Sequence, residues 1–260
     1  MTARDYSTIS PSAQSLLAMR AQTSLPYARR AAEIVFGVDT LEAELARLRA
    51  KEDSQARLFH FTERYRSLDT LLDESGATRI VELGSGLSCR GLALAERKPV
   101  TYVDTDLPAM AATKRQLVDA LAVAPLAGEL RIRDLDALNV EAFRAIVDDL
   151  PPGPFAIVNE GLLMYLDGDE KQRLAATIRE ILIRRGGVWI TADIYLRTPR
   201  DPRTQDERLR RFLEAHRVDE NKFESLAAAE TYFDTCGFAI TRRLARSDDA
   251  IRESWVVSPR

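Results

Sequence analysis

The order of apolar and polar residues divides this chain into a helical first part and an alternating second part. Between residues 10 and 75, apolar positions recur three or four residues apart, which predicts helices. One of these helices is expected to open at Thr40, whose side chain would cap it. From residue 77 onward, short apolar runs alternate with amphipathic segments, as strands alternate with helices. The expected strands are 79–83, 100–104, 129–133, 155–159 and 187–193, and the expected helices between them are 88–97, 108–122, 140–149 and 169–185.

This alternation predicts an α/β fold built on a parallel sheet. It ends after Asp193, because residues 195–222 are charged, contain proline and carry only a short helical piece at 207–215. A helix at 223–235 and two strands, at 236–240 and 253–257, are expected to close the chain. We therefore predict a Rossmann-like open, mostly parallel twisted sheet of about seven strands, with an antiparallel C-terminal strand, helices on both faces and an N-terminal helical cap.

Composition narrows the class of protein. The net charge of −3 and the scattered positions of the 37 basic residues give no basic stripe, so no nucleic-acid partner is expected. Cys89 and Cys236 lie far apart, which suits a reducing compartment. His60 and His216 have no further histidine or cysteine at ligand spacing, so no metal site is expected. No signal-like or membrane-length apolar segment is seen, and we expect a cytoplasmic protein without a membrane partner.

A Gly-x-Gly turn follows the first expected strand, in the stretch Glu-Leu-Gly-Ser-Gly at 82–86. In an open α/β sheet such a turn holds the nucleoside end of a cofactor. A dinucleotide fingerprint would place a third glycine at position 89, but Cys89 stands there and Gly91 comes two residues late. The tight packing that a pyrophosphate requires is therefore not expected. The alternative interpretation of Gly84 and Gly86 is a plain left-handed turn.

The second expected strand carries two carboxylates near its tip, Asp104 and Asp106. S-adenosylmethionine contains no phosphate; its ribose needs a carboxylate at this tip, and its ammonium needs acceptors near the glycine turn. Glu82 lies just before the turn and could serve the ammonium directly or through water. The turn, the missing third glycine and the paired acids together favour S-adenosylmethionine as the cofactor.

With these features in place, the chain resembles the class I S-adenosylmethionine-dependent methyltransferases. More narrowly, it resembles the leucine carboxyl methyltransferase family, which includes bacterial O-methyltransferases of polyketide biosynthesis. The stretches that carry this resemblance are 9–13 (ISPSA), 81–87 (VELGSGL), 102–108 (YVDTDLP), 133–135 (RDL) and 160–166 (EGLLMYL). The last is the most specific, because general methyltransferases do not share it. The resemblance extends from residue 9 to about residue 194.

The resemblance implies a division of roles around the methionine and ribose parts of the cofactor. Gly84, Ser85 and Gly86 would form the turn under the methionine part. Asp106 would hold the ribose, in preference to Asp104, because it adjoins the family's Leu-Pro ending. The alternative role for Asp106 is to cap the helix that follows.

The resemblance also implies contacts at both ends of the cofactor. Asp134 and Leu135 match the pair at the adenine, although Asp134 could instead be a solvated loop residue. Glu160 matches an acidic residue beside the methionine part. A charge at the end of a buried strand needs a partner, which a cationic cofactor would supply; replacing Glu160 by Ala should then abolish binding without unfolding. An early basic residue, Arg20 or Arg64, would bind the cofactor carboxylate.

One departure from the family lies after the glycine turn, where Gly-Leu-Ser-Cys-Arg at 86–90 replaces the usual Gly-Leu-Asp-Thr-Arg. Ser88 can still cap the following helix. Arg90 is interpreted as an outward-facing residue of that helix. Tyr165 is a candidate on the substrate side, with core packing as the alternative. No catalytic residue and no oligomeric state follow from the sequence.

The hypothesis that results is an S-adenosylmethionine-dependent O-methyltransferase acting on a carboxylate or phenol of a small molecule. Residues 1–260 would form one domain: a helical cap (1–76), a cofactor-binding core (77–194), an insertion or lid (195–222) and a closing helix with strands (223–260). The cap and the insertion would close over the site. The alternatives are an NAD(P)-dependent oxidoreductase on a Rossmann-like fold, which the missing glycine disfavours, and a non-catalytic nucleoside-binding protein.

Overall fold

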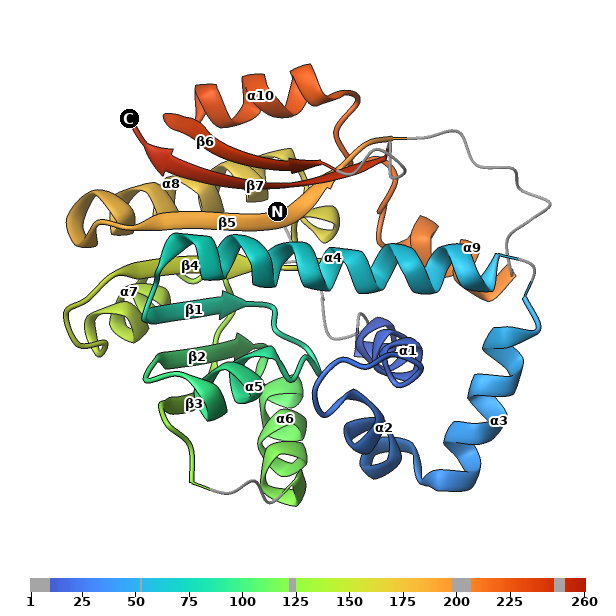
Figure 1. Ribbon diagram of the computed structural model, residues 1–260. Coiled ribbons are helices and arrows are strands. Elements are labelled where there is room, and N and C mark those ends of the chain that lie inside the picture. The colour runs from blue at the N-terminus through green and yellow to red at the C-terminus, as the bar shows by residue number, and fades with distance from the viewer. Residues whose placement is uncertain (1–9, 52, 122–124, 198–206, 246–250) are drawn as a thin grey trace.

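The computed structural model describes residues 10–51, 53–121, 125–197, 207–245 and 251–260. Within these ranges the strands form one sheet with the order β3-β2-β1-β4-β5-β7-β6 (Figure 1). The strands are β1 (Arg79–Leu83), β2 (Thr101–Asp106), β3 (Glu129–Asp134), β4 (Phe155–Asn159), β5 (Val188–Tyr195), β6 (Phe238–Ala245) and β7 (Arg252–Pro259). Strands β1 to β5 are parallel, and β7 runs antiparallel to both β5 and β6. The predicted fold class is confirmed.

The helices follow the predicted rhythm. They are α1 (Ser10–Arg20), α2 (Ala28–Phe36), α3 (Val38–Arg49), α4 (Ser54–Ser75), α5 (Arg90–Arg97), α6 (Pro108–Leu121), α7 (Val140–Asp148), the 3-10 helix η2 (Leu163–Tyr165), α8 (Gly168–Arg185), α9 (Glu207–Ala215) and α10 (Leu226–Thr235). The expected cap at Thr40 is wrong: α3 already begins at Val38, because Gly37 adopts a φ of +75° and breaks the chain there. Residues 1–9, 122 and 198–206, which belong to predicted segments, lie outside the described residues.

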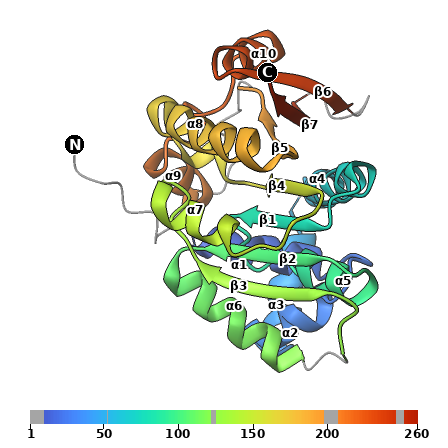
Figure 2. The ribbon, with the colours of Figure 1, turned by 90° about the vertical axis from the view of Figure 1, so that its left-hand side faces the viewer.

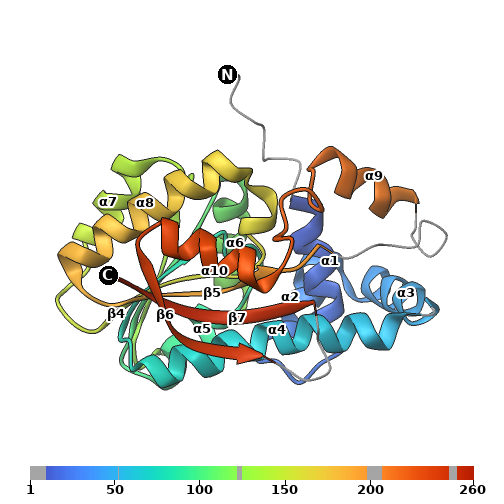
Figure 3. The ribbon, with the colours of Figure 1, turned by 90° about the horizontal axis from the view of Figure 1, so that it is seen from above.

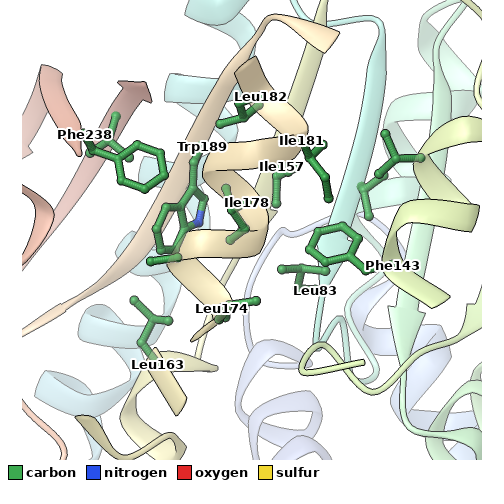
Figure 4. Close-up of a cluster of buried hydrophobic side chains, with 14 of the residues drawn as sticks. Leu83, Phe143, Ile157, Leu163, Leu174, Ile178, Ile181, Leu182, Trp189 and Phe238 are labelled. Carbon is green, nitrogen blue, oxygen red and sulfur yellow. The ribbon is translucent and has the colours of Figure 1, made fainter. Parts of the chain in front are cut away.

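Apolar side chains fill both faces of the sheet. On one face, α7, α8 and α10 cover a cluster that includes Trp189 (Figure 4), whose ring meets Phe233 and Phe238 edge-on at centroid distances of 5.3 and 5.5 Å. On the other face, α4 and α5 cover β1, β2, β4 and β5 (Figure 2). The central strands are buried on both sides, which explains their continuous apolar runs in the sequence.

The N-terminal helices pack beside the sheet as a group of their own. Helices α1, α2 and α3 share an apolar cluster with α6, in which Leu17, Ala31 and Leu41 meet Met110 and Leu117. Helices α1 and α9 lie at the same end of the molecule (Figures 1 and 3), toward which the arrowheads of β1 and β2 point. In an open α/β sheet, ligands bind at this carboxyl end of the strands.

Across the described parts of the chain, every helix is too short or too polar to cross a membrane.

Candidate functional site

A cavity lies where the carboxyl ends of β1, β2 and β4 meet the first helix. Helix α1, the glycine turn after β1, the tip of β2, the segment after β3 and the segment after β4 all contribute to its wall. The lining residues are Ser12, Ala13, Leu16, Arg20, Glu82, Gly84, Ser85, Gly86, Leu87, Ser88, Asp106, Leu107, Ala109, Met110, Leu135, Asp136, Ala137, Leu138, Glu160, Leu162, Tyr165 and Leu166. The predicted core and the predicted cap therefore both contribute to one cavity.

Two features of the turn after β1 require glycine: the backbone conformation and the closeness of neighbouring side chains. Gly84 and Gly86 adopt φ values of +63° and +52°, where residues with a side chain are strained. A Cβ on Gly84 would lie 3.4 Å from Leu162, and one on Gly86 would lie 3.4 Å from Ala13. The buried hydroxyl of Ser85 has no hydrogen-bond partner among the described residues. The turn thus offers the cavity an open backbone surface and an unused hydroxyl.

Asp106 presents a carboxylate at the cavity wall. Its Oδ2 accepts a hydrogen bond from the Gly86 N–H at 2.7 Å and its Oδ1 accepts one from the Leu107 N–H at 2.8 Å. Burial raises its pKa, and these two N–H groups oppose the rise. Asp104 is sealed instead: it is 1% exposed, pairs with Lys114 at 2.7 Å and does not line the cavity. The preference for Asp106 over Asp104 agrees with this placement, and no described hydrogen bond makes Asp106 a cap of α6.

Glu160 is held by three guanidinium groups that come from different helices. Arg20 pairs with its Oε1, Arg64 Nε donates to Oε1 at 2.9 Å, and Arg90 Nη2 donates to Oε2 at 2.5 Å. Although burial opposes ionisation, these arginines hold the pKa of Glu160 well below its usual range. The expectation that a cationic cofactor would supply the partner of Glu160 is corrected, because the protein itself supplies three.

Arg90 connects this group to β1, so its assignment as an outward-facing residue is wrong. Its side chain is 3% exposed; Nη1 donates to Glu82 Oε1 and Nε to Asp69 Oδ1, both at 2.6 Å. The second oxygen of Glu82 accepts the Tyr102 hydroxyl at 2.6 Å. Arg90 is the first residue of α5, and a helical side chain leans toward the helix N-terminus, here back toward the turn. The sequence did hold a signal for this inward position, because Arg90 is the residue of the 86–90 stretch that keeps the family's Arg.

The structure separates the two early arginines that the sequence left open. Arg20 lines the cavity, and its buried Nε has no hydrogen-bond partner in the described part of the chain. Arg64 is only 2% exposed, does not line the cavity, and donates from Nη1 to the Tyr195 hydroxyl at 3.1 Å. Of the two, only Arg20 can reach a molecule in the cavity.

Of the two residues expected at the adenine, the structure places one at the cavity wall. The carboxylate of Asp134 is half exposed, pairs with Arg115 at 3.0 Å and does not line the cavity. Leu135 does line the cavity, and so does Asp136 after it. Successive side chains near a strand end point to opposite sides, so Asp134 faces away when Leu135 faces in. Asp136 was not among the site residues expected from the sequence.

Tyr165 lies at the cavity wall rather than in the core. Its ring contacts Phe212 and His216, in and just after α9, at centroid distances of 6.3 and 6.1 Å. Burial raises the pKa of the Tyr165 hydroxyl, so it remains protonated at neutral pH. Its segment ends at Asp167, which forms a capping box with Glu170 and fixes where α8 begins.

Comparison with known proteins shows the family of this chain. A family model described as leucine carboxyl methyltransferase matches residues 10–179. The chain belongs to the leucine carboxyl methyltransferase family. Curated relatives from Mycobacterium tuberculosis and Mycobacterium bovis are 31% identical over 145 residues, covering 54% of this chain and 48% of each relative. Their names assign them provisionally to the S-adenosyl-L-methionine-dependent methyltransferases. The chain spans about half the length of these curated relatives.

Solved structures share the fold of this family member. The mitomycin 7-O-methyltransferase MmcR aligns with a TM-score of 0.54 and 16% identity, over 99% of this chain and 76% of its own. PigF, solved with SAH, aligns with a TM-score of 0.52 and 16% identity, over 97% of this chain and 69% of its own. At these identities the likeness establishes the fold alone.

Proposed function

We propose that this member of the leucine carboxyl methyltransferase family is an S-adenosylmethionine-dependent O-methyltransferase. Its acceptor would be a carboxylate or phenol on a small molecule. The observation that carries the proposal is that Asp106, the glycine turn and Arg20 face one cavity at the carboxyl ends of β1, β2 and β4. Family membership independently favours this cofactor over NAD(P).

The polar groups of the cavity fit S-adenosylmethionine. The Ser85 hydroxyl and the Arg20 Nε lie buried at the wall and find no hydrogen-bond partner among the described residues, so a polar ligand would satisfy them. Asp106 would accept hydrogen bonds from the ribose hydroxyls with the oxygen lone pairs that its two backbone contacts leave unused. Arg20 would bind the cofactor carboxylate. Leu135 would pack on the adenine ring, and Asp136 rather than Asp134 would accept from its amino group.

Glu82 and Glu160 would act at the methionine end in a different way from Asp106. Both oxygens of each carboxylate already accept hydrogen bonds from protein groups. Glu160 would therefore hold Arg20 in place for the cofactor carboxylate, and its remaining lone pair on Oε2 would face the ammonium. Arg64 and Arg90 would keep Glu160 ionised and oriented, without touching the cofactor.

The bound cofactor would supply a methyl group on a positively charged sulfur. The task of this chain is then to align an anionic or nearly anionic acceptor and to exclude water, which can lower a barrier by roughly 7–11 kcal/mol. Helix α1 already covers the cavity, and α9 reaches Tyr165 through Phe212. These segments would form the lid and the acceptor wall, and deletion of 197–220 should change turnover and acceptor range.

The proposal is tested in two steps on the full chain. Thermal shift and titration calorimetry with S-adenosylmethionine and S-adenosylhomocysteine should show binding, and NADH should not compete. Mass spectrometry with a panel of small carboxylic acids and phenols should then reveal a product heavier by one methylene. Binding without any methylated product across the panel would favour the non-catalytic alternative. Absence of binding would overturn the cofactor assignment.

A further inference from the structure

A buried carboxylate outside the cavity gathers an unusual number of backbone donors. Asp193, near the end of β5, is 2% exposed and does not line the cavity. Its Oδ1 accepts the Gly161 N–H at 2.6 Å, and its Oδ2 accepts the Leu162 N–H at 2.7 Å and the Leu163 N–H at 3.0 Å. The side-chain amide of Asn159 donates to Oδ2 as well, at 2.7 Å. One side chain therefore binds three consecutive peptide groups of the segment that follows β4.

Three consecutive N–H groups can point at one anion only if the backbone curls around it. Gly161 makes this possible with a φ of +80°, followed by Leu162 in a right-handed helical conformation. The curl is also confined from the other side, because a Cβ on Gly161 would lie 3.4 Å from Nη2 of Arg64. The backbone at 160–163 is thus held between Asp193 and Arg64, one of the arginines that bind Glu160.

Strand β5 is irregular at the place where it delivers this carboxylate. Its pairing with β7 shifts between Thr191, opposite Trp255, and Ile194, opposite Glu253, so β5 contains one extra residue there. Such bulges redirect a side chain and are common next to functional sites. The Asp193 N–H donates to the Thr191 hydroxyl at 3.2 Å inside this bulge.

Asn159 completes the support. Its Nδ2 also donates to Thr191 Oγ1 at 3.0 Å, and its Oδ1 accepts the indole N–H of Trp189 at 2.7 Å. The Asp193 carboxylate is therefore tied to the core through Asn159 as well as to the segment it holds. The hydrogen bonds of Asn159 are buried, so the loss of one partner would leave the other group unsatisfied at the full cost of its desolvation.

We infer that Asp193 is a positioning residue for the cavity, acting through the backbone of residues 160–163. The segment it holds carries Glu160 and Leu162 and leads directly to Tyr165. These three residues line the cavity, whereas Asp193 does not. The inference rests on the proposed function for its effect on cofactor binding, although its effect on the backbone does not. Displacing a binding group by about 1 Å can cost on the order of a hundredfold, so loss of this anchor should be felt in the cavity.

The test compares Asp193→Asn with Thr191→Val in the full-length protein. Asn has nearly the same shape but only one acceptor oxygen, and its amide donors would face the backbone N–H groups. Thr191→Val removes buried hydrogen bonds from the same strand, yet it leaves all three peptide donors with their acceptor. Two measurements are made on each variant: affinity for S-adenosylhomocysteine by calorimetry, and hydrogen exchange of peptides that cover residues 160–166.

For Asp193→Asn, affinity should fall by about 10- to 100-fold and exchange should accelerate in residues 160–166 but not across the sheet. Thr191→Val should stay within about threefold of the wild-type affinity, with slow exchange retained in this segment. Equal losses in both variants, or exchange that accelerates uniformly over the whole chain, would assign Asp193 to general stability and overturn the inference.

Should Asp193→Asn fail to fold, Asp193→Glu keeps the buried anion and moves it by one methylene. It should weaken S-adenosylhomocysteine binding and alter exchange at 160–166; wild-type behaviour in both would contradict the positioning role. If the wild-type protein itself does not bind S-adenosylhomocysteine, the proposed function fails. The exchange measurement then still decides the role of Asp193, because it needs no ligand.

Discussion

The two ends of the cavity handle their carboxylates in opposite ways. At the β2 end, the hydrogen bonds that the described residues give to Asp106 come from two backbone N–H groups, which leaves it acceptor capacity toward the cavity. At the β1–β4 end, Glu82 and Glu160 are enclosed by arginines and a tyrosine. An acidic residue at a strand tip can thus face a ligand or hold other side chains in place. Its hydrogen-bond and ion-pair partners show which of these two roles it has. We expect substitution at the first end to affect mainly binding, and substitution at the second end to affect stability as well as binding.

The largest effect is expected for Glu160→Gln. Removing the charge leaves Arg20, Arg64 and Arg90 buried without their shared partner, which should lower the free energy of unfolding by about 3–5 kcal/mol. The expectation from the sequence was lost binding without unfolding, and the arginine cluster adds a loss of stability to it. Urea denaturation measures it. Glu180→Gln, which breaks an exposed pair with Arg144, is the matched control and should change stability little. If both variants were equally stable, Glu160 would not be the centre of the cluster.

The second effect is expected at the β2 end of the cavity, where Asp106 lies. Asp106→Ala should weaken S-adenosylhomocysteine binding by about 1–3 kcal/mol, the range for losing hydrogen bonds to a charged acceptor. Its effect on unfolding should be smaller than that of Glu160→Gln, because Asp106 holds no buried cation. Calorimetry gives the affinity, and Asp119→Ala, at an exposed position of α6, is the control. Unchanged affinity would count against Asp106 as the ribose carboxylate.

The third effect is the pH dependence of the stability that Glu160 contributes at the β1–β4 end of the cavity. The folded pKa of Glu160 lies below its ordinary value of 4.5, so the unfolded chain binds the proton more readily. Its stabilising contribution is therefore complete well above pH 4.5 and is lost as the pH falls toward the folded pKa. The stability gap between wild type and Glu160→Gln should narrow by about 1 kcal/mol on going from neutral pH to about pH 3.5. A gap independent of pH would show that Glu160 is not held as an anion.

The smallest effect concerns Asp134 and Asp136, the two candidates for the contact with the adenine. Asp134→Ala removes an exposed carboxylate paired with Arg115 and should leave S-adenosylhomocysteine affinity unchanged within a factor of about two. Asp136→Ala removes a carboxylate at the cavity wall and should weaken binding about fivefold. Calorimetry on both variants ranks them. The opposite ranking would restore the assignment of Asp134 that the family resemblance implies.

Local patterns were sufficient where a residue's role depends on its own stretch of chain. Strands β1 and β4 have the predicted bounds, because short, mostly apolar runs between turn residues are typical of strands buried on both faces. The glycine turn was recognised from its spacing, and its left-handed backbone explains why glycine is needed. Thr40 was placed wrongly because a glycine three residues earlier starts the helix first.

The sequence by itself therefore determined the fold, the family resemblance and the strand tips at which a ligand would meet the chain, since each depends on apolar periodicity and short spacings. Only the tertiary structure decided which acids are open and which are enclosed. Arg20 lies 140 residues before Glu160, and Asp193 lies some 30 residues after the backbone it holds. A charged group's role depends on the partners that folding brings to it, and burial makes those partners decisive, because an unpaired charge there is costly.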